Sequence, residues 1–236
     1  MAVSTEQVAL VTGANRGIGL GVTRQLASLG FNVILGSREL AKGETAARPM
    51  IEGGWRVIPK QLDVTDQQSI NELKSWVEEQ FGHLDALVNN AAILYDSWQR
   101  ATNAELNTVR EAFETNTLGA WRMCQTFIPL LRESRHGRIV NVSSESGSLA
   151  LMGGGTPAYS VSKVALNALT RMLADELKPS GILVNSVCPG WVATEMGGPD
   201  APRSILEGAA SVVWAVMLPD TGPTGGFFRD GQPLAW

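Results

Sequence analysis

The segment VALVTGANRGIG, residues 8–19, decides the fold of this chain. A nearly all-apolar run leads into three glycines spaced Gly-x-x-x-Gly-x-Gly, and apolar residues at helical spacing follow. The pattern predicts a strand, a tight turn at Gly13, and a helix whose first turn holds Gly17 and Gly19. A helix N-terminus offers backbone N–H groups to phosphate, Gly17 lets the backbone approach a pyrophosphate, and Gly19 allows close helix–strand packing. The segment therefore predicts a phosphate-binding turn, although three glycines alone are also compatible with a turn that binds nothing.

Strand and helix patterns alternate along the rest of the chain, without a repeat, low-complexity tract or linker. We predict strands at Gln7–Thr12, Asn32–Ser37, Trp55–Leu62, Leu84–Asn89, Gly137–Val142, Ile182–Val187 and near Gly226–Phe228. We predict helices at Gly17–Leu29, Leu40–Glu52, Asp66–Phe81, Ala104–Leu131, Thr156–Lys178 and Arg203–Leu218. The expected fold is α/β: a single-domain Rossmann fold over residues 1–236, with a doubly wound seven-stranded parallel sheet flanked by helices. Ligands should bind at the carboxyl ends of its strands.

Composition and charge exclude several classes of function. The 236 residues carry a net charge of -4, which gives no general attraction to nucleic acid or to anionic membranes. No apolar run reaches the roughly 20 residues of a membrane span, and Met1–Gln7 lacks the pattern of a signal peptide. Cys124 and Cys188 are expected to be reduced and buried, and two histidines, His83 and His136, cannot build a His-rich metal site. We therefore expect a cytoplasmic protein with no metal and no nucleic-acid or membrane partner.

The end of the second predicted strand indicates which dinucleotide would bind. NAD sites normally place Asp or Glu there, about 20 residues beyond the glycines, to bind the ribose 2′-hydroxyl. This chain has Ser37-Arg38 instead. The planar fork of Arg38 suits a 2′-phosphate, and Arg16 in the glycine loop can approach the same phosphate from the other side. Each arginine alone is equally compatible with a solvated surface residue, but together they predict NADP(H).

A second group of residues points to acid–base chemistry. Tyr159 and Lys163 are four residues apart on a predicted helix, so their side chains share one face. An adjacent ammonium and a positively charged nicotinamide both favour the phenolate and are expected to lower the pKa of Tyr159. Such a phenol can give a proton to a carbonyl oxygen as hydride arrives at its carbon. The preceding strand lies in RIVNVSSESG, residues 138–147, whose serines reach the ligand edge of the sheet and can stabilise developing negative charge.

Taken together, these motifs resemble the short-chain dehydrogenase/reductase family. They occur in the family's order over nearly the whole chain, and segments such as LDVTD and PGWVATEM look most like the carbonyl reductases. The matching motifs are the glycine loop, Asn89-Asn90-Ala91-Ala92, the region of Asn116, the Ser-Ser segment, Tyr-x-x-x-Lys and Pro189-Gly190. The resemblance implies an NADPH-dependent oxidoreductase that reduces a ketone or aldehyde to an alcohol.

The resemblance also assigns catalytic roles. Tyr159 is the general acid/base, and Lys163 holds the nicotinamide ribose and tunes Tyr159. Ser144 orients and polarises the carbonyl. Asn116 would hold a water molecule that links Lys163 to solvent. Taken alone, however, Asn116 is a helix-interior Asn, for which a satisfied local hydrogen bond is the simpler interpretation.

Cofactor binding involves a larger set of residues. In the family, the Asp-Val pair meets the adenine, the second Asn and first Ala of the Asn-Asn motif back the adenosine ribose, and Val and Thr after Pro-Gly contact the carboxamide and a phosphate. The residues implied for this chain are Gly13, Asn15, Arg16, Gly17, Ile18, Gly19, Ser37, Arg38, Asp63, Val64, Asn90, Ala91, Tyr159, Lys163, Pro189, Gly190, Val192 and Thr194.

Two features depart from the family's pattern. Ala92 stands where the family usually has Gly, and the site must accommodate its methyl group. The usual serine-to-tyrosine spacing is about two residues shorter than Ser144 to Tyr159, which favours Ser146. We nevertheless predict Ser144, because the end of the strand sets the register and the glycines at 153–155 can absorb an insertion.

Three other functions remain to be distinguished. A non-catalytic, redox-sensing NADP(H)-binding module has the same fold but no need for Tyr159, Lys163, a positioned Ser and Asn116 together. A sugar epimerase also uses Tyr and Lys, but usually has a larger C-terminal substrate domain than the segment after Thr194 provides. A serine hydrolase lacks support because the chain has no Gly-x-Ser-x-Gly elbow.

The substrate pocket and the assembly can be predicted only in outline. The walls of the pocket should come from Leu94–Arg100, Glu145–Thr156 and Trp191–Ser204. The Trp, Leu and Met residues of these segments favour an apolar carbonyl substrate, although such residues can also simply fill a core. The predicted helices Ala104–Leu131 and Thr156–Lys178 commonly pair between subunits in this family. The second carries a wider apolar face than one sheet contact needs, so we predict a homodimer or homotetramer.

Overall fold

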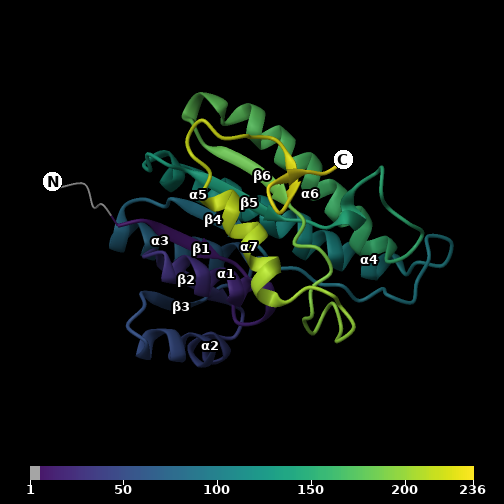
Figure 1. Cartoon of the computed structure of the whole chain (residues 1–236), viewed down its shortest axis with the longest axis horizontal. Helices are drawn as coiled ribbons and strands as arrows, with labels where there is room; N and C mark the ends of the chain where they lie inside the picture. The colour runs from purple at the N-terminus through teal and green to yellow at the C-terminus, as the bar shows by residue number, and fades with distance from the viewer. Residues whose placement is uncertain (1–5) are drawn as a thin grey trace.

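The computed structural model describes residues 6–236 and contains one eight-stranded sheet in the order β3-β2-β1-β4-β5-β6-β7-β8 (Figure 1). The first seven strands pair in parallel, as predicted. Residues 1–5, which open the predicted domain and the Met1–Gln7 segment, lie outside the described part. The strands are β1 Val8–Val11, β2 Asn32–Ser37, β3 Val57–Gln61, β4 Ala86–Asn89, β5 Arg138–Val142, β6 Leu183–Val187, β7 Phe227–Arg229 and β8 Gln232–Pro233.

The eighth strand corrects the predicted seven-stranded sheet. β8 runs antiparallel to β7, with Phe228 opposite Pro233 and Arg229 opposite Gln232. Asp230 and Gly231 join the two strands with φ values of 51° and 75°. An Asp-Gly pair with two positive φ angles is the preferred connection of a tight hairpin, so this turn sends the chain back along the sheet edge.

Helices cover both faces of the sheet, as the apolar strands predicted. α1, α2 and α7 pack on one face, and α3, α5 and α6 on the other. The helix predicted at Ala104–Leu131 is interrupted: a π-helical stretch at Glu114–Gly119 separates α4 from α5. The helices are α1 Gly17–Ser28, α2 Leu40–Glu52, α3 Gln67–Phe81, α4 Leu106–Phe113, α5 Ala120–Arg132, α6 Pro157–Glu176 and α7 Ile205–Val216, with short 3-10 turns at Glu145–Gly147 and Lys178–Ser180.

Alternate side chains of the central strands form two apolar cores. Val8 and Leu10 of β1 face α3, α5 and α6, whereas Ala9 and Val11 face α1, α2 and α7. Both cysteines are buried and free. None of the helices in residues 6–236 combines the length and the apolar character that crossing a membrane requires. The fold therefore directs the carboxyl ends of β1, β2, β4, β5 and β6 to one edge, where the predicted site residues gather.

Candidate active site

The glycine loop forms the turn that the sequence predicted. Gly13 and Gly17 have φ values of 60° and 54°, which side chains rarely adopt. A Cβ atom on Gly19 would lie 2.5 Å from Nδ2 of Asn90, so only glycine fits against the neighbouring strand. No described side chain caps the N-terminus of α1, where Arg16 occupies the cap position. The first N–H groups of α1 are thus available to an anion such as phosphate.

Asn90 and Ala91 pack directly against this loop. The Asn90 side chain donates to the backbone oxygens of Thr12 and Gly13 at 2.9 and 3.1 Å. In return, the Thr12 hydroxyl accepts the backbone N–H groups of Asn90 and Ala91 at 3.0 and 2.9 Å. These reciprocal bonds join the ends of β1 and β4 and hold the loop in place.

The end of β2 presents Ser37 and Arg38 as predicted, but with different environments. Ser37 is buried and donates its hydroxyl to the backbone oxygen of Glu39 at 3.0 Å. Arg38 is exposed. A nearby open cavity of about 460 Å³ is lined by Asn15 of the glycine loop and by Lys42 of α2. Sequence analysis did not single out Lys42, although a cation four residues after Arg38, in the first turn of the next helix, was a usable signal.

The loop after β6 closes over the glycine loop. Thr194 approaches Gly17 closely: a Cβ atom on that glycine would lie 3.4 Å from the Thr194 methyl group. Glu195, the next residue, forms an exposed ion pair with Arg16. The structure therefore places Arg16 against Glu195, a partner that the sequence analysis did not anticipate.

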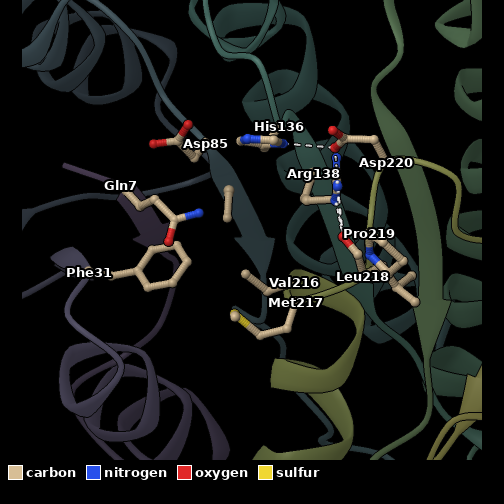
Figure 2. Close-up of a pocket in the computed structure, with 11 residues that line it drawn as sticks. Gln7, Phe31, Asp85, His136, Arg138, Val216, Met217, Leu218, Pro219 and Asp220 are labelled. Atoms are coloured by element: carbon tan, nitrogen blue, oxygen red, sulfur yellow. Dashed lines mark hydrogen bonds and ion pairs between the residues drawn. The ribbon is translucent and has the colours of Figure 1, made fainter. Parts of the chain in front are cut away.

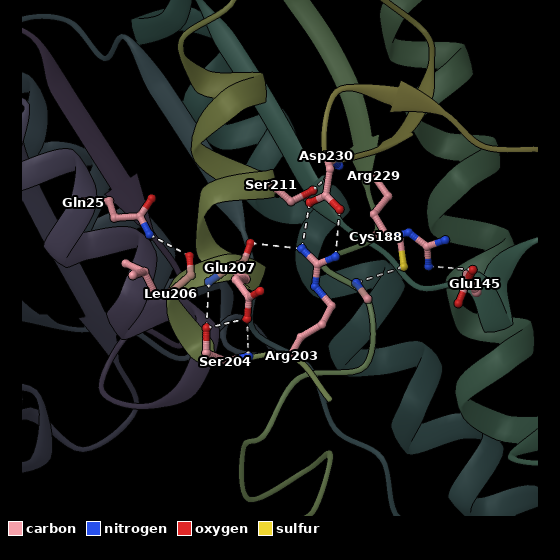
Figure 3. Close-up of polar contacts among 11 residues, drawn as sticks. Gln25, Glu145, Cys188, Arg203, Ser204, Leu206, Glu207, Ser211, Arg229 and Asp230 are labelled. Carbon is pink, nitrogen blue, oxygen red and sulfur yellow. Dashed lines mark hydrogen bonds and ion pairs between the residues drawn. The ribbon is translucent and has the colours of Figure 1, made fainter. Parts of the chain in front are cut away.

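Arg203 anchors the far end of this loop (Figure 3). Its guanidinium makes two bonds of 2.7 Å to the carboxylate of Asp230, in the β7–β8 turn. The Arg203 side chain also lies over Gly190, where a Cβ atom would come within 2.5 Å of it. Pro189 and Val192, which belong to this loop, are buried. The β7–β8 hairpin thus helps to position the segment that carries Val192 and Thr194.

Tyr159, Lys163 and Ser144 meet where β5 ends and α6 begins. The Lys163 ammonium is buried, donates to the backbone oxygen of Val142 at 2.7 Å, and lies 5.6 Å from the centre of the Tyr159 ring. The Ser144 side chain lies beside the Tyr159 phenol and acts to lower its pKa. Ser144 also accepts the backbone N–H of Ser146 at 3.2 Å. Of the two serines considered, Ser144 is therefore the one placed against the phenol.

Burial sets the protonation of this pair. Desolvation raises the pKa of Tyr159 to about 12, although the neighbouring Ser144 acts in the opposite direction. Desolvation also lowers the pKa of Lys163 to about 8. In the chain without cofactor the pKa of Tyr159 is therefore raised above its ordinary value, because loss of solvent is the largest effect on the phenol. Tyr159 is a protonated phenol at neutral pH, as a proton donor must be.

Asn116 lies in the π-helical stretch, and its side chain is fully engaged. Its amide exchanges two hydrogen bonds with the backbone of Ile93, at 2.8 and 3.0 Å, and donates to the Ser162 hydroxyl at 3.0 Å. The neighbouring Thr117 donates to the backbone oxygen of Ser162 at 2.9 Å. These bonds hold the π-helical stretch against α6 at Ser162, the residue before Lys163. π-Helical turns inside α-helices frequently mark functional sites.

Asp63 and Val64 follow β3. One carboxylate oxygen of Asp63 accepts from the backbone and hydroxyl of Thr65 at 2.9 and 2.7 Å. Val64 is buried and packs against Gly119, where a Cβ atom would come within 2.8 Å of its methyl group. These contacts place both residues at the carboxyl edge but commit part of the Asp63 carboxylate to a local turn.

A cavity of about 310 Å³ lies at the opposite edge of the sheet (Figure 2). Its lining includes residues that precede or begin strands, such as Gln7 and Asp85. Arg138 donates two bonds to the backbone oxygen of Leu218 and one to Asp220, which also contacts His136. These polar groups satisfy one another and join β5 to the segment after α7. We therefore interpret the cavity as structural.

The arrangement at the carboxyl edge agrees with comparisons to known proteins. A family profile described as short chain dehydrogenase matches residues 7–203. The chain belongs to this family. Carbonyl reductase 1 (NADPH) of Sus scrofa is 33% identical, over 99% of this chain and 95% of the pig protein. The (+)-neomenthol dehydrogenase of Arabidopsis thaliana is 36% identical, over 98% of this chain and 99% of the plant protein.

Solved structures of other reductases share the fold. The NADPH-bound carbonyl reductase from chicken fatty liver superposes with a TM-score of 0.89 at 28% identity, covering 98% of this chain and 94% of that one. Salutaridine reductase from Papaver somniferum gives a TM-score of 0.83 at 30% identity, covering 95% and 100% of the two chains. These matches confirm the predicted fold class and family.

Proposed function

We propose that this short chain dehydrogenase reduces a ketone or aldehyde to an alcohol with NADPH. The observation that carries the proposal is the meeting of Ser144, Tyr159 and Lys163 beside a glycine loop with an uncapped helix N-terminus. Relatives named for NADPH-dependent carbonyl reduction support it. A panel of carbonyl compounds, assayed by loss of NADPH absorbance, tests it directly. Tight NADPH binding without turnover of any carbonyl would instead favour the non-catalytic redox-sensing module.

The proposed mechanism divides the work among a few side chains. NADPH, when bound, supplies a hydride to the carbonyl carbon. The Tyr159 hydroxyl gives its proton to the carbonyl oxygen, and Ser144 donates a hydrogen bond to the same oxygen as negative charge develops there. Lys163 supports the resulting phenolate electrostatically and holds the nicotinamide ribose. Because the Asn116 amide is already engaged, a proton relay at this position would use its backbone oxygen.

The NADP(H) site would extend along the carboxyl edge from α2 to the loop after β6. Gly13, Gly17 and the N-terminus of α1 suit the pyrophosphate, whereas Arg38 and the neighbouring Lys42 suit the 2′-phosphate. Asp63 would meet the adenine, and Thr194 would contact the nicotinamide end. Arg16 would contribute to this site only by leaving its ion pair with Glu195 and binding the phosphate instead.

Reversing the charge at Arg38 should change the cofactor preference. A charged hydrogen bond to the 2′-phosphate contributes about 1.5–3 kcal/mol, so NADPH should bind at least about tenfold more tightly than NADH. Arg38→Asp should narrow or invert this ratio, measured by fluorescence titration with both cofactors. Arg132→Asp, at the end of α5 near the opposite sheet edge, makes the same change in net charge and should leave the ratio unchanged. Equal affinities in the unmodified protein would contradict the assignment.

We also propose an apolar carbonyl substrate. Several large apolar side chains of the three predicted wall segments are exposed, so they are not used as core packing. Trp98 and Leu149 are 73% and 72% exposed, and Trp191 is 57% exposed. Binding of an apolar ring or chain over these side chains would be favourable, because it removes their apolar surface from water. The cytoplasmic location predicted from the sequence remains part of this proposal.

A homodimer or homotetramer is proposed from the outer face of α6. Val161, Ala168 and Met172 of this helix are exposed along one stripe, and Leu118 and Trp121 are exposed near the start of α5. The alignment with the pig carbonyl reductase spans 282 positions, more than the 236 residues of this chain, so that relative has segments with no counterpart here. A second copy of the chain would bury the stripe.

Light scattering at micromolar concentration should therefore give a mass well above the 25.2 kDa of one chain. Ala168→Arg should reduce the mass to that of one chain, because a long charged side chain would enter the interface. Met217→Glu, at an exposed methionine beyond the end of α7, serves as the control and should not alter the mass. A single-chain mass for the unmodified protein, at every concentration and salt tested, would refute the assembly.

A further inference from the structure

The helix that carries Tyr159 begins in an unusual way. Its cap residue, Thr156, has a φ of 47°, in the left-handed region that β-branched residues rarely adopt, and its side chain does not cap the helix. Pro157 follows as the first helical residue. Tyr159 lies in the first turn, where backbone N–H groups have no partner within the helix. The helix therefore depends on another part of the chain to satisfy these groups.

Asp96 provides the missing cap from 62 residues earlier in the chain. Its Oδ2 accepts the backbone N–H of Ala158 at 2.6 Å and that of Tyr159 at 3.4 Å. A carboxylate at this place also interacts favourably with the positive end of the helix dipole. The cap thus acts on the backbone of the residue that carries the phenol.

The surroundings of Asp96 indicate that this contact holds the loop at 94–100, one of the predicted walls of the substrate pocket, to α6. Asp96 is 0% exposed, and its Oδ1 has no hydrogen-bond partner within residues 6–236. Burying a carboxylate with one unsatisfied oxygen costs free energy, which the bonds to the other oxygen must offset. Arg100 forms an isolated antiparallel bridge with Gly155, immediately before Thr156. The flanking side chains Tyr95 and Trp98 are exposed, whereas Asp96 between them points inward.

We propose that Asp96 is a positioning residue for Tyr159: it couples the loop at 94–100 to the first turn of α6 and sets where the phenol meets Ser144. The inference rests on the proposed function for its catalytic consequence, but not for its structural one. Loss of the cap should let the first turn fray and displace the phenol, and misplacements of about 1 Å can cost on the order of 100-fold in rate.

Kinetics of three variants test the catalytic consequence. Asp96→Ala should lower kcat at least about tenfold while the Kd for NADPH stays within about twofold, because the glycine loop, Arg38 and the loop after β6 are untouched. Asp96→Asn keeps an oxygen for the two N–H groups and should restore kcat to within about threefold. Asp66→Ala is the matched control: Asp66 caps α3 through the N–H of Gln68 at 2.9 Å, on a helix without a reacting group. Equal losses of kcat in Asp66→Ala and Asp96→Ala, or no loss in Asp96→Ala, would overturn the proposal.

The positioning itself is measurable without substrate or cofactor. The chain has two tyrosines, so protein labelled with ¹³C at tyrosine Cζ should give two NMR resonances, which Tyr159→Phe assigns. Asp96→Ala should shift or broaden the Tyr159 resonance, Asp96→Asn should largely preserve it, and Asp66→Ala should leave it unchanged. An unmoved Tyr159 resonance in Asp96→Ala refutes the positioning role. A moved resonance in a protein that reduces no carbonyl would preserve that role and reject the proposed function.

Discussion

Tyr159→Phe is expected to lower turnover by about 100-fold or more, while NADPH still binds with an affinity within about twofold of the unmodified protein. The substitution removes only the hydroxyl, so the ring continues to fill its place at the start of α6. The hydroxyl is the proton donor, and burial holds its pKa at about 12, so it is fully protonated at neutral pH before the reaction. Steady-state rates and fluorescence titration with NADPH measure the two quantities separately.

Two serine variants provide the matched controls for this result. Ser144 contacts the phenol, whereas Ser146 meets Ser144 only through its backbone N–H. Ser144→Ala should therefore lower kcat more than Ser146→Ala does. The opposite order would show that the register chosen at the end of β5 is wrong. Full activity in Tyr159→Phe would reject the proton-transfer mechanism as a whole.

The fold was predictable because its signals are local. Apolar strands, helical spacing and the turn at Gly13 can each be recognised within a short window of sequence. The π-helical stretch at Glu114–Gly119 was missed because apolar spacing continues through it. The contacts that Asn116 makes there, with Ile93 and Ser162, join segments that are remote in sequence. The β7–β8 hairpin had a readable signal in Asp230-Gly231, which the prediction of a parallel sheet overlooked.

The electrostatics of the site were less predictable than the identity of the residues that form it. The spacing of Tyr159 and Lys163 indicates that they share a helix face, but it does not indicate how much water reaches them. The raised pKa of Tyr159 in the chain without cofactor could not be predicted for that reason: desolvation depends on tertiary packing around the phenol. The pair between Arg16 and Glu195 and the cap from Asp96 likewise join segments that are far apart in sequence, so no local pattern indicates them.

Lys163→Ala is expected to lower turnover by about 100-fold or more and, unlike Tyr159→Phe, to weaken NADPH binding as well. Lys163 is assigned two tasks, support of the phenolate and binding of the nicotinamide ribose, and alanine removes both. The same titration and rate measurements distinguish the two variants. Unchanged NADPH affinity in Lys163→Ala would remove the ribose-binding task from this residue.

The pH dependence gives this assignment a sharper test. Desolvation lowers the pKa of Lys163 to about 8, so the ammonium is charged below that pH and neutral above it. The kcat/KM for NADPH reports on the cofactor-free enzyme, and it should therefore fall as the pH rises through about 8. Lys163→Arg keeps its charge throughout this range, so whatever activity it retains should lack the decline. A decline near pH 8 that persists in Lys163→Arg must come from another group, which would separate the pH dependence from Lys163.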